Sequence, residues 1–344
     1  MSAFLIKQFV VFKNQKSKIK NQKSKINYQS AQADKIKNYN MTKTNLPSWN
    51  ETPTKKAITD FIEKITKEGS SDFIPEEDRI AVFDNDGTLW TEQPFQIQII
   101  YCLYRIKDLG DKDPKLVENQ PLKAFYEQDW KTISCMTKKD IFIFVVTALD
   151  GNTPDDYKKL VVDWFNSAIH PKFKFSYYNS FFVPQIELLR YLEEYGFKNF
   201  IVSGGGIEFM KAVCSKMYGI PEYRIIGSSF KSMVEYDGNT PILKRLQELN
   251  SFNDKDEKVN NIHLHIGKKP VLAFGNSDGD LAMIRYTVSN KNGIGFILHH
   301  DDSEREAAYD RDFKISPLIV GLDVAAKEGI NLVSMKEDWN KVFE

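Results

Sequence analysis

The feature that most constrains this chain of 344 residues is a short apolar run that ends in two acidic residues. Ile80–Phe83 reads IAVF, and the sequence DNDGT follows it at positions 84–88. An apolar run with β-branched members is typical of a strand that is buried on both faces in a parallel sheet. Because ligands bind at the carboxyl ends of such strands, Asp84 and Asp86 are candidates for chemistry. A plain turn rich in turn-forming residues is the alternative interpretation.

Two later apolar runs also lead into residues that are suited to chemistry. Residues 200–202 precede Ser203 and the glycines at 204–206, a pattern that can hold a phosphate through a hydroxyl and through backbone N–H groups at a helix start. A simple glycine turn is the alternative for this stretch. Residues 270–274 precede the sequence GNSDGD at 275–280, whose carboxylate and amide oxygens suit a hard cation.

Together these motifs resemble those of the haloacid dehalogenase superfamily of phosphatases, and most closely its phosphoserine-phosphatase-like branch with a helical cap. The first motif of that family is DxDGT, whose first Asp attacks phosphorus and whose second Asp is the general acid and base. The resemblance gives these roles to Asp84 and Asp86. The second motif is a strand that ends in Ser or Thr, so the resemblance implies phosphate binding by Ser203, Gly204 and Gly205.

The third motif of the family is a lysine that neutralises the nucleophile and the phosphate, and three lysines compete for this role. Lys268 and Lys269 precede the strand expected at 270–274, so five strand residues place them roughly 16 Å from its carboxyl end. Lys258 comes before a segment that returns the chain to the start of this strand, so it can lie at the site. We therefore assign the role to Lys258, and an exposed lysine in a charged loop is the alternative.

The fourth motif of the family is GDxxxD, and its first Asp usually binds magnesium. Asn276 stands at that position here, which keeps an oxygen ligand but removes one negative charge. The sequence leaves open whether Asp278 or Asp280 compensates for this loss. The resemblance implies Mg2+ as the cofactor, with the expected metal-site residues Asp84, Asp86, Asn276 and Asp280.

The stretch between the first two motifs is expected to form a helical cap. Residues 94–172 carry apolar side chains at helical spacing and show little strand signal. The predicted fold class is α/β: a Rossmann-like, doubly wound, mostly parallel sheet from residues 46–93 and 173–344, with an inserted all-helical cap. Most aromatic residues of the cap are expected to form its core. Trp90 and Glu92 directly follow the first motif, so we expect them to line the substrate.

The first 45 residues differ sharply in composition from the rest of the chain. They carry a net charge of +9, the remainder carries −9, and the heptapeptide KNQKSKI at 13–19 is repeated at 20–26. A repeat of this composition cannot bury a core, so we expect a disordered basic tail. The alternatives are a mis-assigned start, with Met41 as the true first residue, and a basic arm for nucleic acid or membrane.

The rest of the composition argues against two classes of partner. An acidic body does not favour nucleic acid, and no apolar run approaches the roughly 18 residues of a membrane span. The chain has three cysteines, at positions 102, 135 and 214, without metal or redox spacing. We expect them to be small buried residues in a reducing compartment, and therefore expect a cytoplasmic protein.

Three further patterns lie between residues 236 and 311. The sequence YDGN at 236–239 predicts a hairpin turn. The sequence HHDD at 299–302 follows an apolar run, and we expect a loop there with His299 near the substrate; a metal cluster is the alternative. Residues 303–311 are expected to form an exposed charged helix.

The function that these motifs predict is magnesium-dependent hydrolysis of a small phosphorylated metabolite through an aspartyl-phosphate. A dehalogenase expels a halide and needs no acid, so Asp86 favours a phosphatase over a dehalogenase. A phosphonatase and a catalytically silent module that binds a phosphorylated metabolite remain alternatives. A Ser-His-Asp hydrolase is not supported, because no G-x-S-x-G sequence follows a predicted strand.

Overall fold

The computed structural model describes residues 46–149 and 153–344. The tail predicted for 1–45, and the alternative start at Met41, lie outside the described residues. The described chain forms two compact units. The core unit contains 46–91, Tyr178–Ser229 and Leu249–Glu344, and the helical unit contains the described parts of Glu92–Tyr177 together with Phe230–Glu248. The cap boundaries predicted above stay a prediction.

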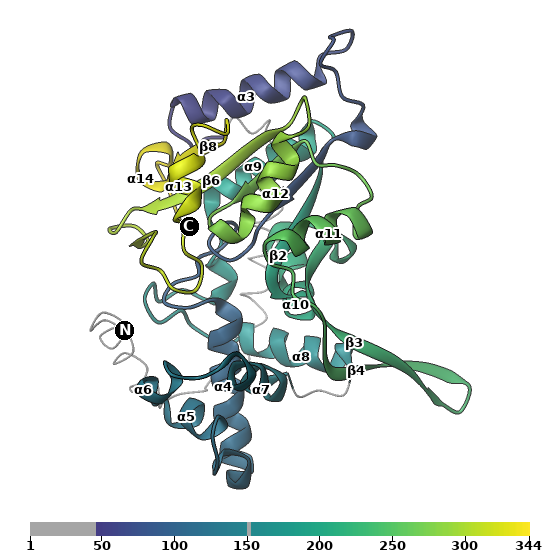
Figure 1. The fold of residues 1–344 in the computed structure, drawn as a ribbon, viewed down its shortest axis with the longest axis vertical. Coiled ribbons are helices and arrows are strands. Elements are labelled where there is room, and N and C mark those ends of the chain that lie inside the picture. Colours follow the sequence, from purple (N-terminus) through teal and green to yellow (C-terminus); the bar gives the residue numbers. More distant parts are fainter. Residues whose placement is uncertain (1–45, 150–152) are drawn as a thin grey trace, which may run out of the picture. The chain divides into compact units, whose positions relative to one another are not determined.

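A mostly parallel sheet is the centre of the core unit, as the sequence predicts (Figure 1). The strands are β1 (Ile80–Phe83), β2 (Lys198–Gly206), β3 (Ile225–Asp237), β4 (Thr240–Ser251), β5 (Leu272–Gly275), β6 (Ile294–Asp301), β7 (Ala308–Tyr309) and β8 (Asn331–Ser334). Within the described residues they follow the order β4-β3-β2-β1-β5-β6-β7, and β8 pairs with β6. β2 pairs in parallel with β1 and β3, β5 with β1 and β6, and β8 with β6, whereas β7 is antiparallel to β6.

Strand β1 lies in the middle of this sheet, and all four of its residues are buried. Phe83, its last residue, pairs with Ile201 of β2 and with Phe274 of β5. The residues that follow Phe83 and Phe274 therefore lie at the same edge of the sheet as Ser203, near the end of β2. This register brings the first, second and fourth sequence motifs together.

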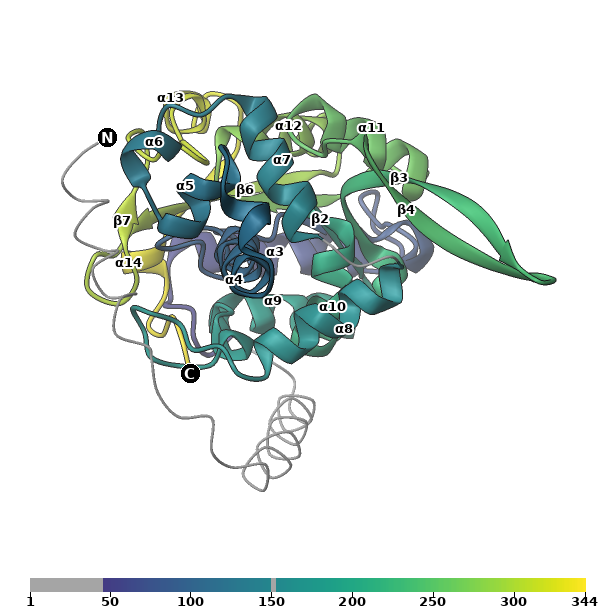
Figure 2. The ribbon, with the colours of Figure 1, turned by 90° about the horizontal axis from the view of Figure 1, so that it is seen from below.

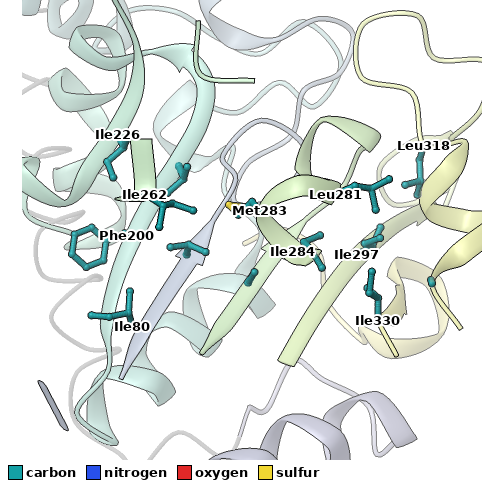
Figure 3. Packing of buried hydrophobic residues seen from close by; sticks show 14 residues of the cluster. Ile80, Phe200, Ile226, Ile262, Leu281, Met283, Ile284, Ile297, Leu318 and Ile330 are labelled. Carbon is teal, nitrogen blue, oxygen red and sulfur yellow. The ribbon is translucent and has the colours of Figure 1, made fainter. Parts of the chain in front are cut away.

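One cluster of buried apolar side chains fixes the strands against helices α11 (Asp256–His265) and α12 (Leu281–Val288). Burying one large aliphatic side chain stabilises a fold by about 1.5–3 kcal/mol, so this cluster holds the strand ends firmly in register. Figure 3 shows the side chains from the two helices facing those from the strands. Members of the cluster include Ile80, Phe200, Ile226, Ile262, Leu281, Met283, Ile284, Ile297, Leu318 and Ile330.

The core unit contains further helices besides α11 and α12. α9 (Val183–Glu194) and α10 (Ile207–Tyr218) contact β2. α9 lies behind the sheet in the view of Figure 1, and α12 lies in front of it. α3 (Pro53–Thr66) buries Ile58, Ile62 and Ile65 along one face, as its spacing predicts. α13 (Val320–Val324) and α14 (Met335–Asp338) are short helices near the C-terminus.

The helical unit contains α4 (Ile97–Lys112), α5 (Leu122–Glu127), α6 (Trp130–Ile133), α7 (Lys138–Ala148) and α8 (Pro154–Phe165). Figure 2 shows α4 end-on, with α5 and α7 beside it. Aromatic rings pack between these helices: Phe125 stacks on Phe144 at 3.8 Å, and Tyr101 meets Trp164 edge-on at 5.5 Å between ring centroids. Among the described residues, the expectation of a helical segment with an aromatic core is confirmed.

Strands β3 and β4 form a long twisted ribbon (Figure 1), and its residues Phe230–Glu248 are grouped with the helical unit. The turn between them contains Gly238, whose φ of +59° is readily adopted only by glycine. The hairpin turn predicted from the sequence at 236–239 is therefore confirmed.

The prediction of an exposed charged helix at 303–311 is wrong. The segment forms turns followed by β7. Asp302 accepts hydrogen bonds from the backbone N–H groups of Glu304 and Arg305, and Arg305 in turn donates to backbone carbonyls near the C-terminus. The side chain of Glu306 is fully buried, although a charged residue in such a run is normally exposed.

Two smaller expectations also need correction. Strand β6 continues to Asp301, so His299 lies in a strand and not in a loop. Cys102 and Cys214 are buried as expected, but Cys135 is exposed. In the part of the chain that the structure describes, no helix is long and apolar enough to cross a membrane.

Candidate active site

Lys258 links the ends of two neighbouring strands. Its ammonium lies 2.8 Å from Oδ1 of Asp84, which follows β1, and 2.5 Å from Oδ1 of Asp280, which follows β5. Lys258 belongs to the first turn of α11 and is only 2% exposed, so the alternative of an exposed loop lysine does not hold. Lys268 instead pairs with exposed Asp78, and Lys269 lies over the ring of Tyr286.

Asp86 is held by a side chain from its own loop. The indole N–H of Trp90 donates to Oδ1 of Asp86 at 2.7 Å. The turn between them closes through the N–H of Gly87, which donates to the carbonyl of Trp90 at 2.8 Å, and Gly87 has a φ of +73° that favours glycine. Trp90 is fully buried, so the structure places it against Asp86, and its expected contact with a substrate stays a prediction.

Ser203 and the glycines after it lie beside Asp86. A Cβ added at Gly205 would be 3.4 Å from Oδ2 of Asp86 and 3.7 Å from Oγ of Ser203, so the three groups adjoin one another. The N–H of Gly205 donates to Oγ of Ser203 at 3.3 Å. Residues 203–206 end strand β2, and helix α10 begins directly after Gly206, so the first N–H groups of α10 follow these glycines at a helix start, where an anion is stabilised.

The backbone at residues 203 and 204 is held by Asn253, a fully buried residue that the sequence analysis missed. Its amide donates to the carbonyl of Ser203 at 2.9 Å, and its own carbonyl oxygen accepts from Asn261 of α11 at 3.0 Å. The hydroxyl of Ser228 accepts from the N–H of Asn253 and donates to the carbonyl of Gly204. Only its position shortly before Lys258 singles out Asn253 in the sequence, because a polar residue in a charged loop is normally exposed.

The loop after β5 uses its acidic residues to fix its own backbone. Oδ2 of Asp280 accepts hydrogen bonds from the N–H groups of Asn276 and Ser277, each at 3.0 Å. Asp278 accepts from the N–H groups of residues 319, 320 and 321. The side-chain oxygen of Asn276 accepts from the hydroxyl of Thr88 at 3.0 Å, so this loop is joined to the DNDGT loop.

Burial shifts the ionisation of the acidic side chains. Desolvation raises the pKa of Asp84 to about 7, although the charge of Lys258 acts in the opposite direction. Desolvation also raises the pKa of Asp86 to about 6, against the hydrogen bond from Trp90. Burial alone would lower the pKa of Lys258, but the charges of Asp280 and Asp84 raise it above its ordinary value. Lys258 therefore stays an ammonium, and two carboxyls are available for proton or phosphoryl chemistry near neutral pH.

Comparison with known protein families agrees with this geometry. A family model described as haloacid dehalogenase-like hydrolase matches residues 81–285, which is more than half of the chain. The chain belongs to the haloacid dehalogenase-like hydrolases. A search of curated proteins gave no significant match.

Similar solved structures include one that shares the fold and two that match more weakly. A conserved protein of unknown function from Anaerococcus prevotii is 16% identical, with a TM-score of 0.53, and the match covers 85% of this chain and 94% of that one. A protein of unknown function from Bordetella pertussis is 13% identical over 74% and 97% of the two chains, with a TM-score of 0.47. A phosphoserine phosphohydrolase-like protein from Francisella tularensis is 15% identical over 65% and 89%, with a TM-score of 0.38.

The charges in this haloacid dehalogenase-like site fit a divalent cation. With Asp84, Asp86 and Asp280 ionised, three buried carboxylates face one ammonium, that of Lys258, and a divalent cation would balance the excess negative charge. No three His, Cys, Asp or Glu side chains of the described residues are arranged to hold a metal ion by themselves. The donor set would therefore combine the Asp84 carboxylate with the backbone carbonyl of Asp86 and the amide oxygen of Asn276, all oxygen donors that suit Mg2+. Both oxygens of Asp280 have protein partners, and the side-chain oxygen of Asn276 accepts from Thr88, so the expected roles of both residues as ligands stay predictions.

The other predicted site residues are placed less directly. Glu92 is fully buried and belongs to the helical unit, so its expected role in lining the substrate stays a prediction. His299 has a partly exposed side chain that lies 3.3 Å from Asp310. Its neighbour on β6, His300, is the histidine that contacts the DNDGT loop, through the carbonyl of Gly87 at 2.7 Å.

Proposed function

We propose that this protein is a magnesium-dependent phosphomonoester hydrolase that acts on a small phosphorylated metabolite through an aspartyl-phosphate. The contact that carries this proposal is the one between Asp84 and Lys258, at 2.8 Å, in a buried site. Asp86 lies two residues away, beside Ser203 and Gly205. A nucleophile, an acid and two groups for binding an anion thus gather at one edge of the sheet.

Asp84 is the nucleophile of the proposed reaction. Its carboxylate attacks the phosphorus atom and forms an acyl-phosphate, while the bond to the leaving oxygen breaks. Lys258 lies against the attacking carboxylate, where its charge also stabilises the oxygens of the phosphoryl group. Ser203 and the N–H groups at the start of α10 provide further hydrogen bonds to those oxygens.

Asp86 is the general acid and base. In the first step its protonated carboxyl gives a proton to the leaving oxygen, and in the second step its carboxylate takes a proton from the attacking water. A pKa of about 6 makes both forms accessible near neutral pH. The hydrogen bond from Trp90 orients the carboxyl and leaves Oδ2 on the side of Gly205 and Ser203.

Mg2+, when bound by Asp84, the Asp86 carbonyl and Asn276, would supply a positive charge that offsets the charge of the phosphoryl group. The buried carboxylates of the site support this requirement, because one ammonium does not neutralise them. The acidic charge of the chain outside residues 1–45 does not favour nucleic acid, which supports a small metabolite as the partner. A cytoplasmic location is part of this proposal.

The test is hydrolysis of p-nitrophenyl phosphate by the purified full chain. We expect turnover with Mg2+, loss of turnover in EDTA, and at least a roughly 1000-fold lower kcat in Asp84→Asn, because the amide cannot attack phosphorus. Asp60→Asn is the matched control, since Asp60 lies exposed on α3 and pairs with Lys56. Full activity in Asp84→Asn would exclude the covalent mechanism, and a wild-type protein inactive on a panel of phosphomonoesters would exclude the proposed function.

A further inference from the structure

His300 and Glu306 form a buried pair beside the DNDGT loop. His300 is 2% exposed and Glu306 is fully buried. Nδ1 of His300 lies 3.2 Å from Oε2 of Glu306, and Nε2 lies 2.7 Å from the carbonyl oxygen of Gly87. The ring of His300 also stacks on Tyr309, with 4.3 Å between ring centroids. The imidazole is therefore held on both of its nitrogens and on one face.

The hydrogen bonds of this pair require a proton on Nε2. A backbone carbonyl can only accept, so Nε2 of His300 donates to Gly87. Glu306 satisfies Nδ1 either as a carboxylate that accepts or as an acid that donates, and its other oxygen accepts from the hydroxyl of Thr91. In both forms Glu306 keeps the imidazole in the orientation that presents Nε2–H to the carbonyl of Gly87. A hydrogen bond at one ring nitrogen of a histidine commonly sets the role of the other nitrogen in this way.

The carbonyl that His300 holds belongs to the turn that aims Asp86. Gly87 donates its N–H to the carbonyl of Trp90, and the indole of Trp90 donates to Asp86. Both polar backbone groups of Gly87 are thus engaged, one by Trp90 and the other by His300. The N–H of Gly87 lies in the peptide that joins it to Asp86, and its carbonyl lies in the peptide that joins it to Thr88. The two bonds therefore fix the peptides on both sides of Gly87, and the second peptide cannot rotate without breaking the bond to His300. Through this turn, the direction of Asp86 depends on His300.

We propose that His300, oriented by Glu306, is a positioning residue for the general acid Asp86. The inference rests on the proposed phosphatase function and adds a residue to it. A fixed catalytic geometry matters because small displacements of a proton donor cost large factors in rate. Simple core packing would explain the burial of His300, but it would not require a buried carboxylate on one nitrogen and a loop carbonyl on the other.

The test compares two conservative variants of His300. The amide nitrogen of Gln lies the same number of bonds from Cα as Nε2, whereas that of Asn corresponds to Nδ1. His300→Gln therefore keeps a donor for Gly87, and His300→Asn keeps one only for Glu306. The readout is kcat/KM for phenyl phosphate, whose leaving group needs a proton, and for p-nitrophenyl phosphate, whose leaving group needs it far less.

We expect His300→Asn to lower kcat/KM for phenyl phosphate by about tenfold or more and for p-nitrophenyl phosphate by about threefold at most, a part of the 10²–10⁴-fold effect of general acid catalysis. His300→Gln should stay within about threefold of wild type on both. When Asp86→Asn is already present, adding His300→Asn should cause no further loss, since His300 acts through Asp86.

Three results separate the possibilities. Equal losses in His300→Asn and His300→Gln, or equal losses on both esters, would overturn the positioning role while leaving the phosphatase function intact. A wild-type protein that hydrolyses neither ester would instead refute the function on which the inference rests. If His300→Asn does not fold, Glu306→Gln replaces it: this variant keeps the size of the side chain and should show the same preference for p-nitrophenyl phosphate at smaller amplitude.

Discussion

Two loops of this protein have similar sequences but use their acidic residues differently. The loop after β1 and the loop after β5 both follow a buried strand, and each carries two aspartates two residues apart. After β5, Asp278 and Asp280 accept backbone N–H groups that define the local fold. After β1, Asp84 and Asp86 are held by the side chains of Lys258 and Trp90.

The difference shows what a carboxylate at the end of a strand needs in order to react. A carboxylate that accepts several backbone N–H bonds is stabilised in its charged form and committed to the fold. A buried carboxylate with fewer such bonds keeps the cost of desolvation, which is why the pKa values of Asp84 and Asp86 are raised. The β5 loop therefore supports the site, and the β1 loop performs the proposed chemistry.

The largest loss of stability is expected from Asp280→Asn. The new side chain keeps an oxygen for the backbone N–H groups, but it removes the negative charge that Asp280 places against the Lys258 ammonium. Breaking a buried ion pair costs about 3 kcal/mol. We expect the free energy of unfolding to fall by about that amount in urea titrations. We also expect kcat for p-nitrophenyl phosphate to fall roughly 100-fold, because Lys258 is no longer held towards Asp84. Unchanged stability would contradict the supporting role of the β5 loop.

Asp84→Asn should change how stability depends on pH. Its folded pKa, about 7, lies above the ordinary 3.8, so the folded state binds the proton more tightly than the unfolded state. This contribution to stability is fully present below pH 3.8 and is lost as the pH rises through 7. In EDTA, the stability of Asp84→Asn relative to wild type should therefore rise by roughly 2–4 kcal/mol from pH 4 to pH 8, because only wild type loses this contribution. Thermal unfolding at both pH values checks this, with Asp60→Asn as the control; a difference from wild type of equal size at both would refute it.

The smallest changes in stability and activity are expected from Asp278→Asn. Both oxygens of Asp278 accept from the N–H groups at the start of α13, and Asn keeps only one of them, so the lost hydrogen bond costs about 1 kcal/mol. Activity should stay within about twofold of wild type, since the side chain faces the segment 319–321. Comparison with Asp280→Asn by urea titration and by turnover keeps the change in charge constant. A larger loss of activity in Asp278→Asn than in Asp280→Asn would show that the metal depends on Asp278 instead.

The sequence predicted the parallel sheet well, because buried strands need continuous apolar runs. It also predicted that Asp86 and Ser203 lie close together, whereas their roles stay predictions. It also identified Lys258 through the path of the chain between two elements. It did not predict that Asn253 and Glu306 are buried, or that His300 contacts the DNDGT loop. Each of these is a polar or charged residue that is buried only because partners distant in sequence satisfy its hydrogen bonds.

What the sequence by itself determined is which residues emerge from the central strands: apolar runs of four or five residues specify the strands, and the polar residues after them mark the reactive edge. What only the tertiary structure decided is the task of each polar group at that edge. Asp84 and Asp280 share the same residue type and the same lysine, and they differ in the number of backbone N–H groups that the folded chain brings to them. That number depends on how distant segments fold against one another, and no local pattern encodes it.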